Sequence, residues 1–351
     1  MNKTSPTRVL LVRSGTSDDN NYDLLRVMLA LAVIISHAAP VVIGEGAQEP
    51  LSGILNGTTL GDVAVGGFFA VSGYLVTASW RRSTALGYLQ KRAARILPGF
   101  IVACAITALL ACATSLNRTG SFTCTSWWRA VATTVTLRRP IVCFAYSANP
   151  YPMETNASLW TIKYEVGCYV ATALLGLSGL LLAKRRIAIV LLFIGLAMAG
   201  VLLDGGSFSR APLGNAIHLA AFYVAGMAVY CFRDVLPRSR ALTILSFVFI
   251  ALSSLSRQLV MIALPTAGVY LMFRFVYADR VFAPNLKRSV GDLSYGLYLY
   301  GWPVAQSITA LIGPKAPGVW PLAIASILAC LPIAYASWHF IEKPFLSLVP
   351  R

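Results

Sequence analysis

The chain has 351 residues, of which 57% are hydrophobic and only 12% are charged. A mean hydropathy of +0.69 excludes an ordinary soluble globular domain and indicates an integral membrane protein. The net charge of +16 does not indicate a nucleic-acid partner, because the basic residues form short clusters between apolar runs, where they mark membrane topology.

The apolar runs predict an all-α, polytopic membrane protein of about ten transmembrane helices with no large soluble domain. We divide the chain into a polar cytoplasmic tail (1–21), a membrane domain (22–345) and a short cytoplasmic tail (346–351). No A-x-A cleavage pattern follows the first run, so it is interpreted as a retained span rather than a signal peptide. The predicted spans are 23–42, 62–80, 95–114, 159–181, 187–203, 213–232, 241–255, 258–278, 290–311 and 319–341.

The first span, YDLLRVMLALAVIISHAAP, contains Arg26 and His37. Eleven residues separate them, so on a helix they lie on nearly one face, about 16 Å apart. Ionisable groups inside a membrane usually face a cavity or the bundle interior. Arg26 and His37 therefore have two interpretations. They are either the two ends of a reaction path, or a snorkelling arginine and a buried structural histidine. Asp23, one turn earlier, is a candidate salt-bridge partner for Arg26.

The second span contains GGFFAVSGYLV at 66–76. Its small residues let a neighbouring helix approach the backbone closely, which is the simplest interpretation. Phe68, Phe69 and Ser72 also suit a narrow slot for a linear ligand arm.

The following basic cluster, 81–95, contains Arg92 and Arg95. These residues are i, i+3 neighbours at the predicted cytoplasmic membrane edge. Two guanidinium groups there can bind a phosphate by bidentate hydrogen bonds, or anchor the helix to anionic lipid headgroups.

The loop 115–158 is too long to be only a connector. Its tryptophans, tyrosines and prolines predict an interfacial helix or a re-entrant lid. Cys124 and Cys143 both lie in it, on the predicted periplasmic side, where either a disulfide or two free thiols is possible. No cysteine or histidine spacing matches a zinc site, so no metal is expected.

Glu165 in the fourth span lies at a predicted depth similar to that of His37, in the outer half of the bilayer. A carboxylate in contact with an imidazole raises its basicity and stabilises the imidazolium, so we predict contact between these two side chains. His218 is a rival partner or a simple hydrogen-bonding residue of the bundle. Asp292 opens the ninth span and favours that helix N-terminus.

The charge distribution favours cytoplasmic N- and C-termini. Together with Arg95, the predicted inner loops hold fourteen basic residues, against seven in the outer loops. The inner loops are 81–94, 182–186, 233–240 and 279–289.

These motifs together resemble the bacterial membrane acyltransferases of the acyltransferase-3 type, which O-acetylate surface polysaccharides. The resemblance rests on the order and spacing of several motifs along nearly the whole chain. These are Arg26-x10-His37, FFAVSG at 68–73, Arg92-Ala-Ala-Arg95, the segment 149–169 with Ser158-Leu159-Trp160 and Glu165, GDLSYGLYLYGWPV at 291–304 and HFIEKP at 339–344.

The resemblance implies an enzyme of the bacterial inner membrane that uses acyl-CoA, most often acetyl-CoA, from the cytoplasm as a co-substrate. It implies His37 as the catalytic base and Glu165 as a residue that orients it or binds the acceptor. The implied residues for acyl-CoA binding are Arg26, Arg92, Arg95, Phe68, Phe69 and Ser72. Glu165 is followed by Val-Gly-Cys-Tyr instead of the family's bulkier run, which reshapes the expected acceptor pocket.

The expected reaction is transfer of an acetyl group to a hydroxyl of a cell-surface carbohydrate or its lipid-linked precursor. The alternative is a proton-coupled transporter or flippase for a glycan or lipid, which intramembrane histidine and glutamate would also suit. The identity of the acceptor, direct transfer against an acyl-histidine intermediate, and the oligomeric state stay open.

Overall fold

The computed structural model describes residues 10–12, 20–119, 132–140, 142, 145–203, 212–284, 286–313 and 318–349. Within these residues all regular structure is helical, apart from one isolated bridge between Leu10 and Pro237. The first half contains α1 (Tyr22–Ile43), α2 (Pro50–Ile54), α3 (Leu60–Trp80), α4 (Ala85–Thr119), η2 (Ala157–Thr161) and α6 (Ile162–Leu177). The second half contains η3 (Ala183–Arg185), α7 (Ile187–Leu203), α8 (Pro212–Cys231), α9 (Arg240–Ser253), α10 (Arg257–Ala263), η4 (Leu264–Gly268), α11 (Val269–Val276), α12 (Leu286–Val290), α13 (Leu293–Ile312), α14 (Val319–Ser337), η6 (Trp338–Glu342) and α15 (Lys343–Ser347).

The prediction of a polytopic, all-α membrane protein is confirmed. Each predicted span overlaps a helix or a continuous run of helices. Among the described residues, six helices are long and apolar enough to cross a membrane, and α7 and α9 are shorter apolar helices. The count of ten crossings stays a prediction.

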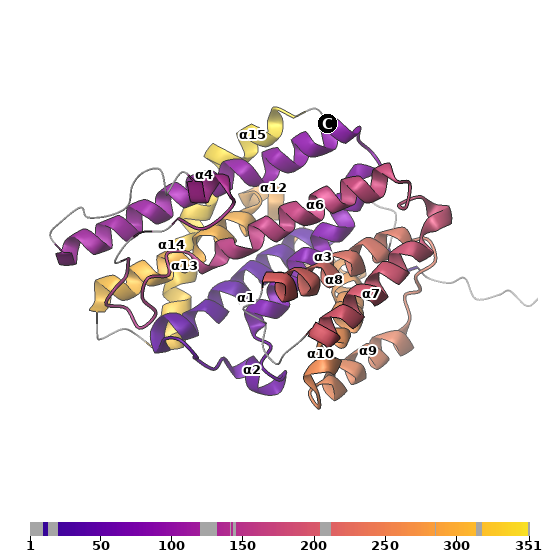
Figure 1. Ribbon diagram of the computed structural model, residues 1–351, viewed down its shortest axis with the longest axis horizontal. Coiled ribbons are helices and arrows are strands. Elements are labelled where there is room, and N and C mark those ends of the chain that lie inside the picture. Colours follow the sequence, from indigo (N-terminus) through magenta and orange to yellow (C-terminus); the bar gives the residue numbers. More distant parts are fainter. Residues whose placement is uncertain are drawn as a thin grey trace, which may run out of the picture.

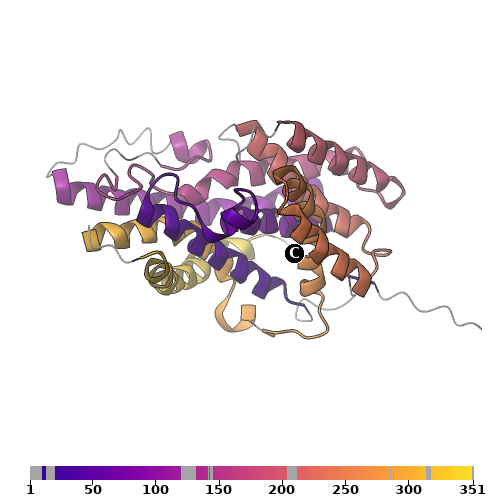
Figure 2. The same cartoon turned by 90° about the horizontal axis from the view of Figure 1, so that it is seen from below.

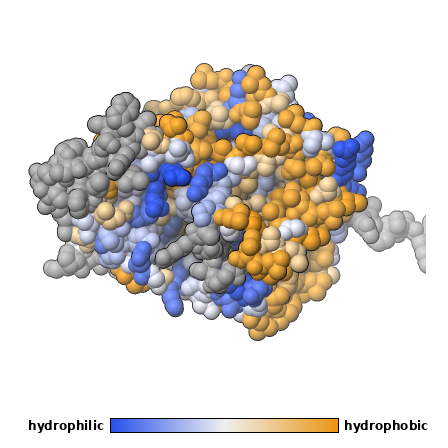
Figure 3. Space-filling model, in the orientation of Figure 1, coloured by the Kyte–Doolittle hydropathy of each residue, from blue (hydrophilic) through white to orange (hydrophobic). Residues whose placement is uncertain are grey.

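The helices form one bundle around α1, α3 and α13, seen from two sides in Figures 1 and 2. Helices α7, α9 and α10 lie together at one side, where Figure 3 shows a broad hydrophobic surface. Large apolar side chains of α7 and α9 are exposed there, including Leu191, Met198, Ile244 and Phe247. Apolar side chains that face outward are expected where helices contact lipid.

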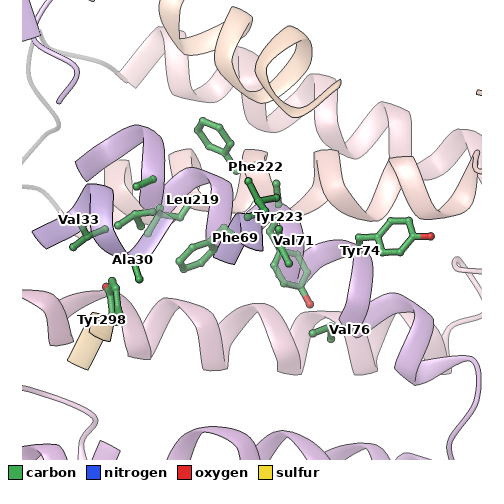
Figure 4. Close-up of a cluster of buried hydrophobic side chains, with 14 of the residues drawn as sticks. Ala30, Val33, Phe69, Val71, Tyr74, Val76, Leu219, Phe222, Tyr223 and Tyr298 are labelled. Carbon is green, nitrogen blue, oxygen red and sulfur yellow. The ribbon is translucent and has the colours of Figure 1, made fainter. Parts of the chain in front are cut away.

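The glycine-rich stretch of α3 packs closely against α8, as its small residues predict. A Cβ at Gly73 would lie 1.9 Å from the Tyr223 carbonyl oxygen, and one at Gly226 would lie 1.9 Å from that of Ala70. Only glycine at both positions permits this approach of the two backbones. Figure 4 shows Phe69 and Val71 of α3 close to Tyr223 of α8 in the resulting core. The contact fixes the helix that carries FFAVSG.

Helices α1 and α13 run in the same direction. Arg26 near the start of α1 contacts Asp292 at the start of α13, and His37 further along contacts Trp302. The bundle therefore has an Asp292 end, where both helices begin, and a Gly44 end beyond the last turn of α1.

The second part of the long loop packs into the bundle beside α13. Whether it is an interfacial or a re-entrant segment of the membrane stays a prediction. Residues 146–161 follow α13 in reverse from the Gly44 end, held by hydrogen bonds at every level. The Asn149 amide donates to Gln306, the Trp302 indole donates to the Glu154 carbonyl, and the Asn156 amide donates to the Leu299 carbonyl. Cys124 and Cys143 lie outside the described residues.

Candidate functional site

A cavity of about 360 Å³ collects seven of the eight predicted site residues. Its walls come from α1, α3, α4, α6 and α13, all at the Asp292 end of the bundle. The predicted residues that line it are Arg26, Phe68, Phe69, Ser72, Arg92, Arg95 and Glu165. Lys91, Tyr169, Asp292 and Tyr298 line it too. We call this space the arginine cavity.

Asp292 bridges two of the arginines. Its Oδ2 lies 2.6 Å from Arg26 Nη1 and 2.8 Å from Arg95 Nη2. The carboxylate of Glu342 lies 3.8 Å from Arg95 Nη1. The prediction that Asp23 is the partner of Arg26 is therefore wrong: the Asp292 side chain is only 5% exposed, and a buried carboxylate requires cations beside it. Asp292 does stand at the N-terminus of α13, as predicted, but its side chain makes no capping hydrogen bond there and pairs with the two arginines.

Of the three arginines in this cavity, Arg92 is the one that forms no ion pair among the described residues. Its Nη2 lies 3.5 Å from Ser79 Oγ, its Nε is buried without a hydrogen-bond partner, and its guanidinium lies 5.7 Å from the Tyr169 ring centroid. Lys91 beside it donates to Ser83 Oγ. With four cations and two carboxylates in its lining, the arginine cavity favours an anionic ligand, and Arg92 is the residue best placed to bind it.

Glu165 belongs to the arginine cavity and does not contact His37. Its Oε1 accepts a hydrogen bond from Tyr169 Oη at 2.5 Å and a longer one from Ser72 Oγ at 3.3 Å. The predicted contact between Glu165 and His37 is therefore wrong. The prediction placed residue 159 at the edge of the membrane and derived the depth of Glu165 from a helix that starts there. Residue 156 already lies inside the bundle beside Leu299 of α13, so Glu165 lies nearer the Asp292 end than a helix count from residue 159 gives.

His37 lines a second cavity of about 210 Å³ towards the Gly44 end. Its ring packs edge-on against Trp302, with 5.0 Å between centroids. The other polar, charged or aromatic residues of the lining are Ser36, Glu49, Thr59, Asp62, Ser158, Trp160 and Tyr298. Val65 and Tyr298 line both cavities, so the two spaces adjoin. We call this space the histidine cavity.

Three buried polar atoms in the histidine cavity have no hydrogen-bond partner among the described residues: His37 Nδ1, Glu49 Oε1 and Ser158 Oγ. Buried polar groups are nearly always satisfied, so three such atoms in one small cavity mark a place for a polar ligand. Sequence analysis missed Glu49 and Asp62. The signals available were Glu49 in the polar loop that follows the His37 helix, and Asp62 three residues after Thr59 in the capping box that starts α3.

His218 does not take the role of rival partner to His37. It is buried in α8 with its ring 5.2 Å from that of Phe222, and it lines neither cavity. Its packing fits the alternative interpretation, a residue of the bundle interior.

Residues 19–339 match a family described as an acyltransferase domain, of the acyltransferase-3 type. The O-acetyl transferase of Shigella phage Sf6 is 26% identical over 93% of this chain and 96% of its own. Nodulation protein 10 of Rhizobium leguminosarum bv. viciae is 28% identical over 94% of each chain. The peptidoglycan O-acetyltransferase OatA of Listeria monocytogenes is 34% identical over 19% of this chain and 11% of its own. No solved structure matches.

Proposed function

The chain belongs to the acyltransferase-3 family, and on that premise we propose that it transfers an acetyl group from acetyl-CoA to a hydroxyl of a cell-surface carbohydrate or its lipid-linked precursor. The names of two relatives, an O-acetyl transferase and a peptidoglycan O-acetyltransferase, support O-acyl transfer to a carbohydrate. Family membership favours this enzyme over the transporter or flippase that the sequence left open.

The observation that carries the proposal is the meeting of two cavities of different chemistry. The arginine cavity offers Arg92, supported by Lys91, to the phosphates of CoA. Phe68 and Phe69 form an apolar wall beside it, along which a pantetheine arm would extend. From Arg26 to His37 the helix rises about 16 Å, so the thioester at the end of a long arm would reach the junction at Val65 and Tyr298.

His37 acts in this proposal as the general base. The acceptor oxygen forms a bond to the thioester carbonyl carbon while the imidazole takes its proton. The carbon–sulfur bond then breaks, and the imidazolium returns the proton to the departing thiolate. The products are an ester and free CoA, so all atoms and protons balance without a metal or a further co-reactant.

Glu165 is a positioning residue in this scheme. Its carboxylate holds Ser72 and Tyr169 in the wall of the arginine cavity, and the Tyr169 ring in turn lies beside Arg92. The carboxylate also offsets part of the positive charge around the donor. Its effect on the reaction is therefore exerted through the donor side.

We place the Asp292 end at the cytoplasm, with both termini on that side of the bacterial inner membrane. The basic loops 81–94 and 182–186 then lie inside, as the positive-inside rule requires. Acyl-CoA reaches the arginine cavity from the cytoplasm, and the carbohydrate reaches the histidine cavity from the periplasm.

The test uses the purified full chain with acetyl-CoA and the surface glycan of a strain that lacks the gene. Wild-type protein should release free thiol and increase the mass of the glycan by one acetyl group. His37→Ala should lower the transfer rate about 10²- to 10⁴-fold and leave the Kd for CoA unchanged. His339→Ala is the matched control: it removes a histidine that contacts Tyr335 and lines neither cavity, and should transfer normally. Wild-type transfer by His37→Ala would refute the assignment.

A further inference from the structure

From the histidine cavity we infer the chemical class of the acceptor: a single uncharged sugar ring, anchored through a second hydroxyl by Glu49. This inference rests on the proposed function, because it names the substrate of the same site. It starts from Glu49, which belongs to none of the motifs in the sequence and lies with His37 in the same cavity lining.

Glu49 has the geometry of an anchor for a ligand. It precedes Pro50 at the start of α2, lines the histidine cavity, and is only 8% exposed. Its Oε2 accepts the hydrogen bond of the Leu60 backbone N–H, which fixes the carboxylate. Its Oε1 is buried and has no hydrogen-bond partner in the part of the chain that the structure describes. A fixed, desolvated carboxylate oxygen is a strong acceptor that a hydroxyl group of a ligand would satisfy.

The other unpartnered atoms complete a pattern for neighbouring hydroxyls. Ser158 Oγ can donate or accept, and His37 Nδ1 supplies a second site on the imidazole. Trp160 and Tyr298 add aromatic surface to the same lining, against which the C–H groups of a sugar ring pack. The volume of about 210 Å³ is below the roughly 300–1,000 Å³ of pockets for larger ligands, so it admits one ring rather than a stretch of polymer.

The charges in the lining select an uncharged ring. Glu49 and Asp62 are both in the lining, and none of the lining residues is a lysine or arginine. A uronic or ulosonic acid would bring a third carboxylate into this partly desolvated space, where like charges repel strongly. A hexose, deoxyhexose or N-acetylhexosamine brings only hydrogen-bond donors and acceptors.

In the transfer step Glu49 keeps its electron pairs and forms no covalent bond. It accepts a hydrogen bond from the hydroxyl beside the reacting one, which turns the reacting oxygen towards His37 and the thioester. The proton of the reacting hydroxyl passes to His37 and then to the thiolate, as in the proposed function.

The experiment compares Glu49→Gln with Glu45→Gln in the purified full chain, using acetyl-CoA and the glycan of the deletion strain. In Glu49→Gln the amide oxygen still accepts from Leu60, but the position of Oε1 now holds an N–H donor, so a sugar hydroxyl can no longer donate to it and the charge-assisted hydrogen bond is lost. We expect the KM for the glycan to rise about 10- to 100-fold while the Kd for CoA stays at the wild-type value. Glu45 is exposed in the same loop, and its variant should behave as wild type.

Two further measurements test whether the sugar is uncharged and whether Ser158 takes part in binding it. Ser158→Ala should also raise the KM for the glycan, and hydrolysis of the acetylated glycan should place the acetyl group on an uncharged sugar. An acetyl group on a uronic or ulosonic acid, or a wild-type KM in Glu49→Gln, overturns the inference. Neither result affects the proposed function, which is refuted if the wild-type protein releases no thiol or leaves the glycan unacetylated; the role of His37 in it is refuted if His37→Ala transfers normally.

Discussion

The arginine cavity and the histidine cavity meet at Val65 and Tyr298, yet they satisfy their polar groups in opposite ways. In the arginine cavity, Arg26 and Arg95 are held by Asp292, and Glu165 is held by Tyr169. In the histidine cavity, His37, Glu49 and Ser158 each keep an unpartnered buried atom. The arginine cavity is braced by ion pairs within its lining and leaves Arg92 Nε as an unpartnered buried atom, whereas the histidine cavity has no ion pair among the described lining residues and three unpartnered atoms.

The difference follows from what each ligand brings. Acyl-CoA carries several negative charges, so cations must be kept apart and oriented before it arrives, and a buried aspartate between two arginines does that. A sugar hydroxyl carries no charge, so single unmet donors and acceptors suffice to recognise it. Variants in the arginine cavity should therefore affect stability and CoA binding, and variants in the histidine cavity should affect the glycan.

The largest effect on stability is expected from Asp292→Asn. The change leaves Arg26 and Arg95 without their shared counter-charge, and breaking a buried ion pair costs about 3–5 kcal/mol. Thermal unfolding in detergent should show a large loss of stability. Asp234→Asn is the control, because its pair with Arg186 is exposed and contributes about 0–1 kcal/mol. Equal unfolding temperatures for the two variants would contradict the bracing role of Asp292.

The fold and the arginine cavity were largely predictable from the sequence. Hydropathy gave the helices, and the Arg-x10-His, FF-x-x-SG and R-x-x-R motifs supplied most of the predicted residues that line the arginine cavity. This succeeds because each motif lies on a regular helix, where spacing determines which face a side chain occupies. The close contact of α3 with α8 at Gly73 was predictable in the same way, from the small residues of the second span.

Sequence reasoning failed where the backbone is not helical. The predicted contact between Glu165 and His37 assumed that the fourth span begins near residue 159 at the membrane edge. Residues 146–161 instead already lie inside the bundle beside α13. Glu49 follows a loop that contains Gly44 and Gly46, both with positive φ, and such a loop returns the chain over the end of α1 in a way that no periodicity encodes. Asp292 and Arg95 pair across about 200 residues of sequence, beyond the reach of local spacing.

Within the arginine cavity, Arg92→Ala should weaken the binding of CoA without weakening the ion pairs that stabilise the cavity. Arg92 makes one long hydrogen bond and no ion pair among the described residues, so its removal should change stability little. Charge-assisted hydrogen bonds to phosphate contribute about 1.5–3 kcal/mol, and the Kd for CoA should rise about 10- to 100-fold. Calorimetric titration with CoA at low and high salt measures this. Arg186→Ala, at an exposed site away from the cavity, should bind CoA normally; an equal loss in both variants would mean that net charge alone attracts the donor.

The smallest effect is expected where the two cavities join. Tyr298 Oη donates to the Ser158 carbonyl at 2.7 Å and lies 2.5 Å from Thr161 Oγ1, while its ring packs against Phe68 with 5.8 Å between centroids. Tyr298→Phe keeps the ring but loses these hydrogen bonds, and each contributes about 0.5–1.5 kcal/mol to stability. The backbone at Ser158 is then less well fixed. Initial rates should show the KM for the glycan raised a few-fold and the Kd for CoA unchanged.

Tyr295→Phe provides the matched comparison for Tyr298→Phe. Tyr295 donates to the Ile96 carbonyl and lines only the arginine cavity of the two. Its variant should alter CoA binding slightly and leave the KM for the glycan at the wild-type value. If both phenylalanine variants changed the same kinetic constant, the two cavities would act as one undivided site, and the separation of donor from acceptor at Val65 and Tyr298 would be wrong.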